Sequence, residues 1–160
     1  PACQVYLGAD YEFASTNQAV DETRGILLYY GDQIITGYYF STSGGWTENN
    51  ENVWGGIPLP WLRGVASPGE EESPYNSWKT RTFSRNEIEQ WLNSDSDTAV
   101  GVLERITITK RGVSGHSMAV TLTGSWGTKT VTGQTLKYVI NVNLPDGTQD
   151  YIKSTIFGIQ

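Results

Sequence analysis

Two apolar runs near the start of the chain predict a β-hairpin. Residues 26–30 and 33–40 are rich in aromatic and β-branched side chains, and Gly31-Asp32 separates them. Two residues of this kind between two such runs are typical of a tight hairpin turn. We therefore expect two antiparallel strands in this part of the chain.

Apolar residues in the second half recur at every second position. This alternation covers 106–108, 118–122 and 136–142, and it is the pattern of strands that are buried on one face. Turn-forming residues at 111–115 and 124–127 separate the first strands. The pattern predicts an antiparallel sheet or barrel built from this half.

Two capping boxes predict two short helices. Residues 15–18, Ser-Thr-Asn-Gln, precede a helical segment that Gly25 ends, and residues 84–87, Ser-Arg-Asn-Glu, precede one that ends near Asn93. The second helix has one apolar face, formed by Ile88, Trp91 and Leu92.

Residues 41–78 follow neither pattern. They form a long stretch with several prolines and four tryptophans, Trp46, Trp54, Trp61 and Trp78. Large rings anchor a loop, whereas disordered linkers lack them. We expect one α+β, β-rich domain over residues 1–160, with a mainly antiparallel sheet or barrel, two short helices and this long ordered loop.

Composition and charge exclude several classes of protein. The chain has 160 residues and a net charge of −6, with no run of Lys or Arg, so nucleic acid is not an expected partner. The longest apolar run, 25–30, is far too short for a membrane helix. No glycine-rich phosphate loop occurs, and Cys3 and His116 are too isolated to form a zinc site. We expect no cofactor and no metal. Cys3 is either a buried thiol or the partner of a cysteine elsewhere.

Nucleophilic chemistry is not indicated either. His116 is the single histidine and lies in a turn, and no Gly-x-Ser-x-Gly motif precedes a helix. Among the carboxylates, Glu48 is the best placed, because it lies between Trp46 and Trp54. It is either a contact to substrate or a loop carboxylate that accepts hydrogen bonds from nearby backbone N–H groups, and the second role is the commoner one. The triplet 70–72 is interpreted as a solvated acidic run.

The Ser-Thr-Ser-Gly-Gly run at 41–45 presents small hydroxyls and unobstructed backbone N–H groups after a predicted strand. Such a surface suits a sugar or an acetamido group, although a simple glycine turn is the alternative. Nearby tryptophans either stack on sugar rings or anchor the loop. The predicted substrate-binding residues are Tyr39, Ser41, Thr42, Ser43, Gly44, Gly45, Thr47, Glu48 and Trp54.

Five motifs occur in order along the chain. They are Ala2-Cys3-Gln4-Val5-Tyr6-x-Gly8, Ala19-Val20-Asp21-x-Thr23-Arg24-Gly25, Tyr38-Tyr39-x-Ser41-Thr42-Ser43-Gly44-Gly45-x-Thr47-Glu48-Asn49, Val53-Trp54-Gly55 and Pro60-Trp61-Leu62-Arg63-x-Val65-x-Ser67-Pro68. Together they resemble the SpoIID/LytB family of bacterial cell-wall proteins. The resemblance covers essentially the whole chain.

This resemblance implies an extracytoplasmic role in processing the glycan strands of peptidoglycan. SpoIID-type members are lytic transglycosylases, in which one Glu acts first as acid and then as base, and LytB-type members enhance cell-wall amidases. In the family, that Glu precedes the Cys-Gln-Val-Tyr motif, so the chain resembles the C-terminal portion of such a domain, and no residue in it is predicted to be catalytic. Ala2 stands where some members have a zinc-binding His.

Three functions remain open at this stage. The chain is part of a lytic transglycosylase, or a non-catalytic module that binds glycan or enhances an amidase, or an unrelated adhesin-like domain. If an N-terminal segment belongs to the fold, we expect an exposed apolar patch or an unpaired strand edge near 3–6, the first helix or the hairpin. The partners expected are therefore glycan strands, together with an N-terminal segment of the same protein or a cell-wall amidase.

Overall fold

The computed structural model describes residues 7–76, 79–145 and 151–160, and Cys3 and Trp78 lie outside them. The chain divides into two compact units, Pro1–Tyr39 (unit 1) and Phe40–Gln160 (unit 2), and each is described by itself. The described residues form four α-helices and two antiparallel sheets. The predicted α+β class is confirmed.

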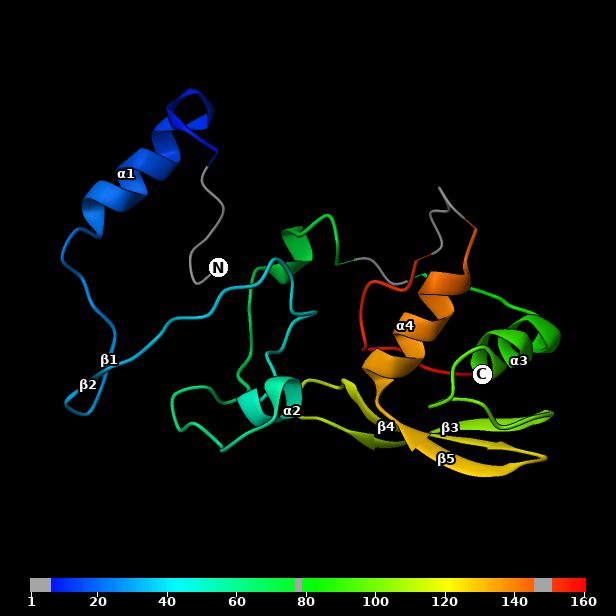
Figure 1. The fold of residues 1–160 in the computed structure, drawn as a ribbon. Coiled ribbons are helices and arrows are strands. Elements are labelled where there is room, and N and C mark those ends of the chain that lie inside the picture. Colours follow the sequence, from blue (N-terminus) through cyan, green and yellow to red (C-terminus); the bar gives the residue numbers. More distant parts are fainter. Residues whose placement is uncertain (1–6, 77–78, 146–150) are drawn as a thin grey trace. The chain divides into compact units, whose positions relative to one another are not determined.

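Unit 1 contains a short helix and a minimal hairpin (Figure 1). The elements are the 3-10 helix η1 (Ala9–Tyr11), α1 (Ala14–Glu22), β1 (Tyr29–Tyr30) and β2 (Gln33–Ile34). Tyr29 pairs with Ile34 and Tyr30 with Gln33, which confirms the hairpin, although each strand has only two residues.

The start of α1 differs from the prediction. The hydroxyl of Thr16 accepts from the Phe13 N–H at 3.3 Å and donates to the Phe13 carbonyl at 2.7 Å, so Ser15 is not the N-cap. The N-cap is Phe13, two residues earlier than predicted, and because its side chain has no acceptor the predicted capping box is not formed. Gly25 follows the helix with a φ of +78°, where a left-handed residue commonly ends a helix.

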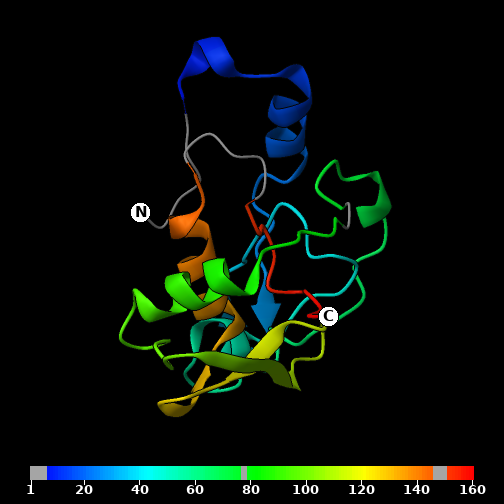
Figure 2. The ribbon, with the colours of Figure 1, turned by 90° about the vertical axis from the view of Figure 1, so that its right-hand side faces the viewer.

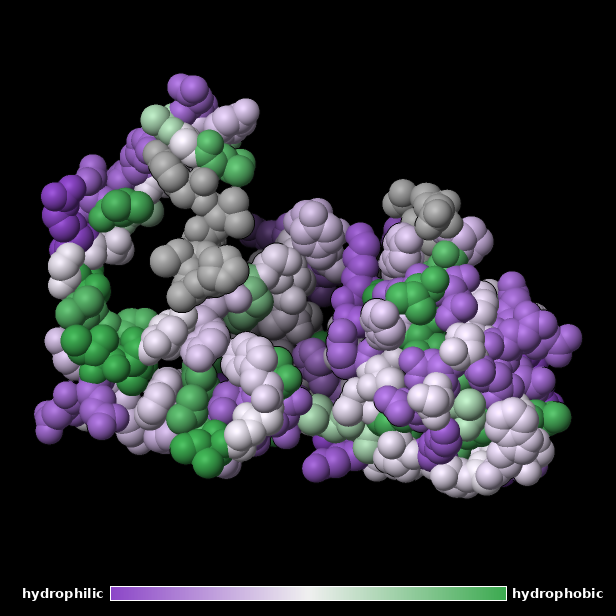
Figure 3. All heavy atoms as spheres, in the orientation of Figure 1, coloured by the Kyte–Doolittle hydropathy of each residue, from purple (hydrophilic) through white to green (hydrophobic). Residues whose placement is uncertain are grey.

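None of the described residues of unit 1 is buried. Large apolar side chains that are half or more exposed lie along the hairpin and around α1: Phe13, Val20, Ile26, Leu27, Leu28, Tyr29, Ile34, Tyr38 and Tyr39. Figure 3 shows apolar surface on this unit. The expected apolar patch is confirmed at the first helix and the hairpin, and positions 3–6 lie outside the described residues.

Unit 2 is built on a three-stranded antiparallel sheet in the order β3-β4-β5. The strands are β3 (Leu103–Arg111), β4 (Ser117–Gly124) and β5 (Gly127–Val131). The two turns that join them are those predicted from the sequence. Within the described residues the sheet is open, so the barrel alternative is wrong.

Two helices cover one face of this sheet, as Figures 1 and 2 show from two sides. They are α3 (Arg85–Asn93) and α4 (Gly133–Asn143). The predicted capping box of α3 is confirmed, because Ser84 accepts from the Glu87 N–H at 3.2 Å while Glu87 accepts from the Ser84 N–H at 2.8 Å. The buried apolar core between the layers consists of Leu92, Val100, Leu103, Val120, Leu122, Leu136, Val139, Ile140 and Leu144.

The segment 136–142 was predicted as a strand, and this prediction is wrong. Its buried apolar residues are Leu136, Val139 and Ile140, which have the spacing of a helix face, whereas Tyr138 and Val142 are more than half exposed. The alternation in the sequence arises because exposed apolar residues fill the other positions. The N-terminus of α4 is fixed by the Thr132 hydroxyl, which accepts from the Thr135 N–H at 3.0 Å.

Candidate functional site

The predicted site lies in the first part of unit 2. Residues 41–48 are called the site loop, and residues 45–47 within it run alongside residues 65–67 as an antiparallel ladder of one bridge. Trp46 bridges to Ala66, the Thr47 N–H donates to the Val65 carbonyl at 2.8 Å, and the Ser67 N–H donates to the Gly45 carbonyl at 3.0 Å. The predicted long loop is therefore held by its own hydrogen bonds.

The helix α2 (Asn50–Trp54) follows the site loop and was not predicted, because five residues give too short a pattern. It is held by Asn50, which is 5% exposed, and by Arg63. The Asn50 side chain donates to the Ile57 carbonyl at 2.9 Å and accepts from the Leu59 N–H at 2.8 Å. The Arg63 guanidinium donates to the same side-chain oxygen of Asn50 and pairs with Glu51 at 2.5 Å.

Glu48 joins the end of the site loop to the turn between β3 and β4. Its carboxylate accepts from the Asn49 N–H at 2.9 Å and from the Asn52 amide at 2.8 Å. The same carboxylate also accepts hydrogen bonds from the β3–β4 turn, 65 and 66 residues further along the chain. The donors are the Val113 N–H at 3.3 Å, the Ser114 N–H at 3.2 Å and the Ser114 hydroxyl at 2.6 Å. The commoner of the two roles considered for Glu48, a carboxylate bound to backbone N–H groups, is confirmed.

This environment keeps Glu48 ionised. Partial burial raises the pKa of its carboxyl group, but the hydrogen bonds from Ser114, Asn52 and the Asn49 backbone outweigh that effect and lower the pKa to about 2. Glu48 is therefore a poor general acid, because such an acid must be protonated at the working pH.

Glycines make room for this contact. A Cβ added to Gly112 would lie 1.9 Å from Oε2 of Glu48, and a Cβ added to Gly64 would lie 2.3 Å from Cγ2 of Val113 and 2.7 Å from the Thr47 carbonyl oxygen. Real Cβ atoms do not approach so closely, so a side chain at Gly64 would displace backbone and one at Gly112 would displace the Glu48 carboxylate from its contacts.

Ser114 places a hydroxyl between a carboxylate and an imidazole. Its Oγ binds Oε2 of Glu48 and Nδ1 of His116. Burial lowers the pKa of His116; the Glu48 charge opposes this shift and Lys137 adds to it. In a hydrolase triad the imidazole lies between serine and carboxylate, and here the order differs, so the arrangement does not activate Ser114 as a nucleophile. It holds the turn in place.

Two N–H groups of the Ser-Thr-Ser-Gly-Gly run, those of Ser43 and Gly44, are not open. The carboxylate of Glu70 accepts from the Ser43 N–H at 2.6 Å and 2.8 Å, one distance to each oxygen, and from the Gly44 N–H at 2.9 Å. It also accepts from the Ser67 hydroxyl at 3.0 Å. The solvated-run interpretation is therefore wrong for Glu70. Desolvation raises its pKa, but these hydrogen bonds prevail and lower it to about 2.

Most of the predicted site residues lie on the site loop of unit 2, Trp54 lies on α2, and Tyr39 belongs to unit 1. Ser41, Gly44 and Gly45 are exposed on the site loop, while the Thr42 hydroxyl is bonded to that of Ser73 at 2.6 Å. Thr47 is half-buried in the ladder. Trp54 closes α2 at 62% exposure, and Tyr39, at 70% exposure, is the last residue of unit 1. Substrate contact by these residues remains a prediction.

Sequence reasoning missed the residues that fix the loop from a distance, namely Asn50, Arg63, Glu70, Gly112 and Ser114. The only signal in the sequence was their chemistry, because glycine, a carboxylate or a guanidinium within or near a loop is a possible anchor. Nothing local indicates that Glu70 reaches back 27 residues to Ser43.

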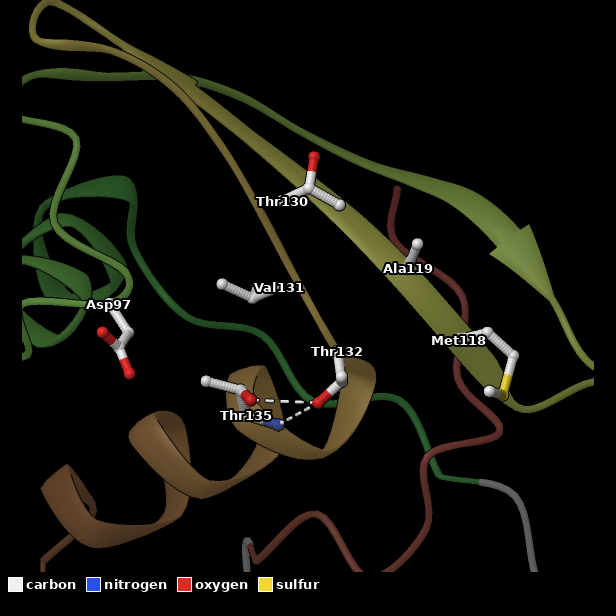
Figure 4. A pocket seen from close by; sticks show the side chains of 7 residues that line it. All are labelled: Asp97, Met118, Ala119, Thr130, Val131, Thr132 and Thr135. Carbon is white, nitrogen blue, oxygen red and sulfur yellow. Dashed lines mark hydrogen bonds between the residues drawn. The ribbon is translucent and has the colours of Figure 1, made fainter. Parts of the chain in front are cut away.

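A shallow pocket of about 440 Å³ opens elsewhere in unit 2, beside β4, β5 and the start of α4 (Figure 4). It is lined by Asp97, Met118, Ala119, Thr130, Val131, Thr132 and Thr135. Thr132 and Thr135 are bonded to each other in the helix cap, at 2.9 Å between their hydroxyls. None of the predicted site residues lines this pocket.

Three curated proteins share substantial identity with the chain. Stage II sporulation protein D of Bacillus subtilis (strain 168) is 33% identical over 144 residues, covering 87% of this chain and 38% of that protein. Stage II sporulation protein D of Bacillus amyloliquefaciens is 40% identical over 87 residues, covering 53% of this chain and 25% of that protein. The amidase enhancer of Bacillus subtilis (strain 168) is 34% identical over 88 residues, covering 55% of this chain and 12% of that protein.

The chain thus spans less than two fifths of the length of these relatives. No protein-family model matches it, and no solved structure matches it significantly. Across the part of the chain that the structure describes, no helix is both long enough and apolar enough to cross a bilayer.

Proposed function

We propose that this chain, which belongs to the SpoIID/LytB family, forms the glycan-binding part of an extracytoplasmic lytic transglycosylase that acts on peptidoglycan strands. Its similarity to stage II sporulation protein D and to the amidase enhancer supports a cell-wall related role. Membership also removes the unrelated adhesin-like domain from consideration.

One feature of the site carries the proposal. The site loop is fixed at both ends by carboxylates, Glu70 at Ser43 and Gly44 and Glu48 at the β3–β4 turn. Between these anchors the exposed side includes Trp46, which is 44% exposed, and the two glycines that precede it. A strip with an exposed aromatic ring beside glycines and small hydroxyls suits the alternating apolar faces and hydroxyl edges of a sugar chain.

The acid for glycosidic cleavage has to come from another carboxylate. Cleavage needs a carboxyl group that is protonated near neutral pH. The pKa values of Glu48 and Glu70 are about 2, and Glu51 is paired with Arg63. The family resemblance implies a catalytic Glu that precedes this sequence in the full-length protein, and the low pKa of Glu48 and Glu70 supports that placement. This preceding Glu would protonate the leaving oxygen and then take the proton of the muramic 6-hydroxyl.

The test is made on the full-length protein with peptide-free glycan strands as substrate. We expect mass spectrometry to detect anhydromuramyl ends, and we expect those ends to disappear when the upstream Glu is changed to Gln. The matched control is Glu104→Gln, an exposed carboxylate on β3, which should leave the products unchanged. Unaltered strands after incubation with the unmodified protein would overturn the enzymatic proposal.

A second candidate is a non-catalytic module that binds glycan or enhances a cell-wall amidase. It is favoured by the identity to the amidase enhancer and by the ionised state of Glu48 and Glu70. In that case the full-length protein should co-sediment with glycan strands and produce no anhydromuramyl ends. It should also increase the rate at which an added cell-wall amidase releases peptides.

A further inference from the structure

The N–H groups of Ser43 and Gly44 form a binding site for a carboxylate. Gly44 has a φ of +83°, and the two successive N–H groups converge on Oε2 of Glu70, at 2.6 Å and 2.9 Å. Such a concave pair of backbone donors, often called a nest, binds anions. In this structure the anion is a side chain of the same molecule, so Glu70 shows which chemical group the nest accepts.

Glu70 is held at the nest by polar contacts. It lies in the short 3-10 helix η2 (Glu70–Glu72), which has no buried residue. Its neighbours Glu71 and Glu72 are both exposed, and they place two further acidic side chains beside it. The Glu70 carboxylate can therefore move into water without uncovering an apolar core, at the cost of its hydrogen bonds to Ser43, Gly44 and Ser67.

The backbone beside the nest is open at Gly45, whereas a Cβ added to Gly44 would lie 3.1 Å from Cδ1 of Ile156. A Cβ added to Gly45 would meet no atom within 4 Å, so the backbone next to the nest is open on that side. Trp46 follows immediately and is 44% exposed. A sugar ring that contacts the Trp46 ring could therefore bring a substituent to the N–H groups of Ser43 and Gly44.

We propose that the nest of Ser43 and Gly44 is a subsite for a carboxylate carried by the sugar chain, and that Glu70 occupies it until such a sugar takes its place. This inference rests on the proposed function and names the part of the substrate that the site loop selects. Muramic acid carries a lactyl ether whose carboxylate is free where no peptide is attached. N-acetylglucosamine has the same ring and acetamido group without that carboxylate.

Exchange of one carboxylate for another explains how the loop distinguishes the two sugars. When the lactyl carboxylate replaces Glu70, both N–H groups keep a charged acceptor and none is left unsatisfied. A neutral sugar would offer the N–H groups of Ser43 and Gly44 only weaker acceptors. The displaced Glu70 carboxylate would also lose its hydrogen bonds to these N–H groups. A peptide amide on the lactyl group removes the charge and enlarges the substituent, so peptide-free strands should be preferred.

The test compares Glu70→Ala and Glu70→Gln with the unmodified full-length protein, using N-acetylmuramic acid and N-acetylglucosamine as probes. We expect Glu70→Ala to bind N-acetylmuramic acid at least tenfold more tightly than the unmodified protein, as measured by titration calorimetry. Affinity for N-acetylglucosamine should change less than twofold. In protein labelled with nitrogen-15 at serine and glycine, the probe should shift the amide signals of Ser43 and Gly44.

Glu71→Ala is the matched control, because Glu71 is exposed and neighbours Glu70 in the same short helix. It should behave as the unmodified protein. Glu70→Gln removes the charge and keeps the side-chain volume, so it separates an effect of the charge from an effect on the fold. Its affinity for N-acetylmuramic acid should also rise, by less than that of Glu70→Ala. The proposal is overturned if neither Glu70 variant gains affinity, or if both sugars gain equally.

These outcomes are distinct from failure of the proposed function. If peptide-free strands bind to the full-length protein but both Glu70 variants bind N-acetylmuramic acid no better, the carboxylate subsite is wrong and glycan binding stands. If the Glu70 variants gain affinity for the monosaccharide while strands are neither bound nor cleaved, the subsite is right and the proposed function is wrong.

Discussion

Helices α1 and α3 have the same length and opposite surroundings. Each has nine residues; Ser84 caps the first turn of α3, whereas at the start of α1 the hydroxyl of Thr16 is bonded to the backbone of Phe13. α1 buries nothing, whereas α3 buries Leu92 and packs Ile88 and Trp91 against the core, with Trp91 also in edge contact with Phe83 at 5.3 Å between ring centroids. An isolated helix of about this length is marginal in water, so packing is what makes α3 stable.

The two sheets repeat this contrast. β1 and β2 pair over two residues each and present exposed apolar side chains. In the larger sheet, β3 buries Leu103, β4 buries Val120 and Leu122, and Val131 of β5 packs against the same core. A single hairpin has too little buried surface to be stable alone, while three strands with a covered face have enough. Turn and cap signals in the sequence therefore locate elements in both units, but only unit 2 has the buried surface that stabilises them.

The largest expected effect comes from truncating a core residue and a matched exposed one. Leu122 is fully buried and Leu28 is 56% exposed. Leu122→Ala should reduce the free energy of unfolding by about 2–5 kcal/mol, because it leaves a cavity in a packed core. Leu28→Ala should change it by less than about 0.5 kcal/mol. Urea denaturation checks both, and similar losses would show that unit 1 has a core of its own.

The next effect concerns the contact between the site loop and the β3–β4 turn. In Gly112→Ala the new methyl group would collide with the Glu48 carboxylate, so we expect a loss of about 1–3 kcal/mol. Gly158→Ala is the control, since a Cβ there meets nothing within 4 Å. Thermal unfolding measures the difference, and equal stability of the two variants would contradict the tight fit at Gly112.

Acid should weaken the same contact. The pKa of Glu48 is about 2 in the folded protein and about 4.5 when unperturbed, so its stabilising effect is complete above pH 4.5 and is lost as the pH falls towards 2. Because Glu48 is partly exposed, we expect a contribution of about 1–2 kcal/mol. Glu48→Gln should remove this part of the pH dependence. Denaturation at pH 6, 4 and 2.5 measures how the free energy of unfolding of each protein depends on pH. If the unmodified protein and Glu48→Gln show the same dependence, Glu48 does not stabilise the fold through its charge.

The smallest effect separates the two helix caps. Ser84→Ala should cost about 1 kcal/mol in global unfolding, because α3 is part of the cooperative core. Thr16→Ala removes the hydroxyl bonded to the Phe13 backbone at the start of α1 and should leave global unfolding unchanged. Hydrogen exchange should already be fast in α1 before the substitution. Protected α1 amides in the unmodified protein would show that α1 is stabilised by packing.

The sequence predicted the elements whose signals are local. The capping box at Ser84, the turn at Gly31-Asp32 and the turns on both sides of β4 were identified because each depends on a few consecutive residues. α4 was predicted as a strand because Tyr138 and Val142, which are exposed, imitate a buried alternation. Burial decides between the two periods, and burial is a property of the folded chain.

The candidate site was predictable in its chemistry and not in its partners. The run at 41–45 was predicted to leave its backbone N–H groups open to a sugar or an acetamido group, whereas in the structure the N–H groups of Ser43 and Gly44 are bonded to the carboxylate of Glu70. Glu48 was predicted as a substrate contact, with a loop carboxylate as the alternative, and the Ser114 hydroxyl that it binds in the structure lies 66 residues away. Contacts over such separations depend on the tertiary fold, which no short pattern encodes.

The closure around Asn50 and Arg63 makes residues 51–62 a self-contained loop. The Asn50 N–H donates to the Leu62 carbonyl at 3.1 Å and the Gly64 N–H to the Asn49 side chain at 2.8 Å, so the two ends are tied together at the base. At the far side, Cβ atoms added to Gly55 and Gly56 would meet nothing within 4 Å. Chain added there lengthens a loop that is already closed, at little entropic cost. This is where a fluorescent reporter or an epitope can be inserted to follow the protein in living cells.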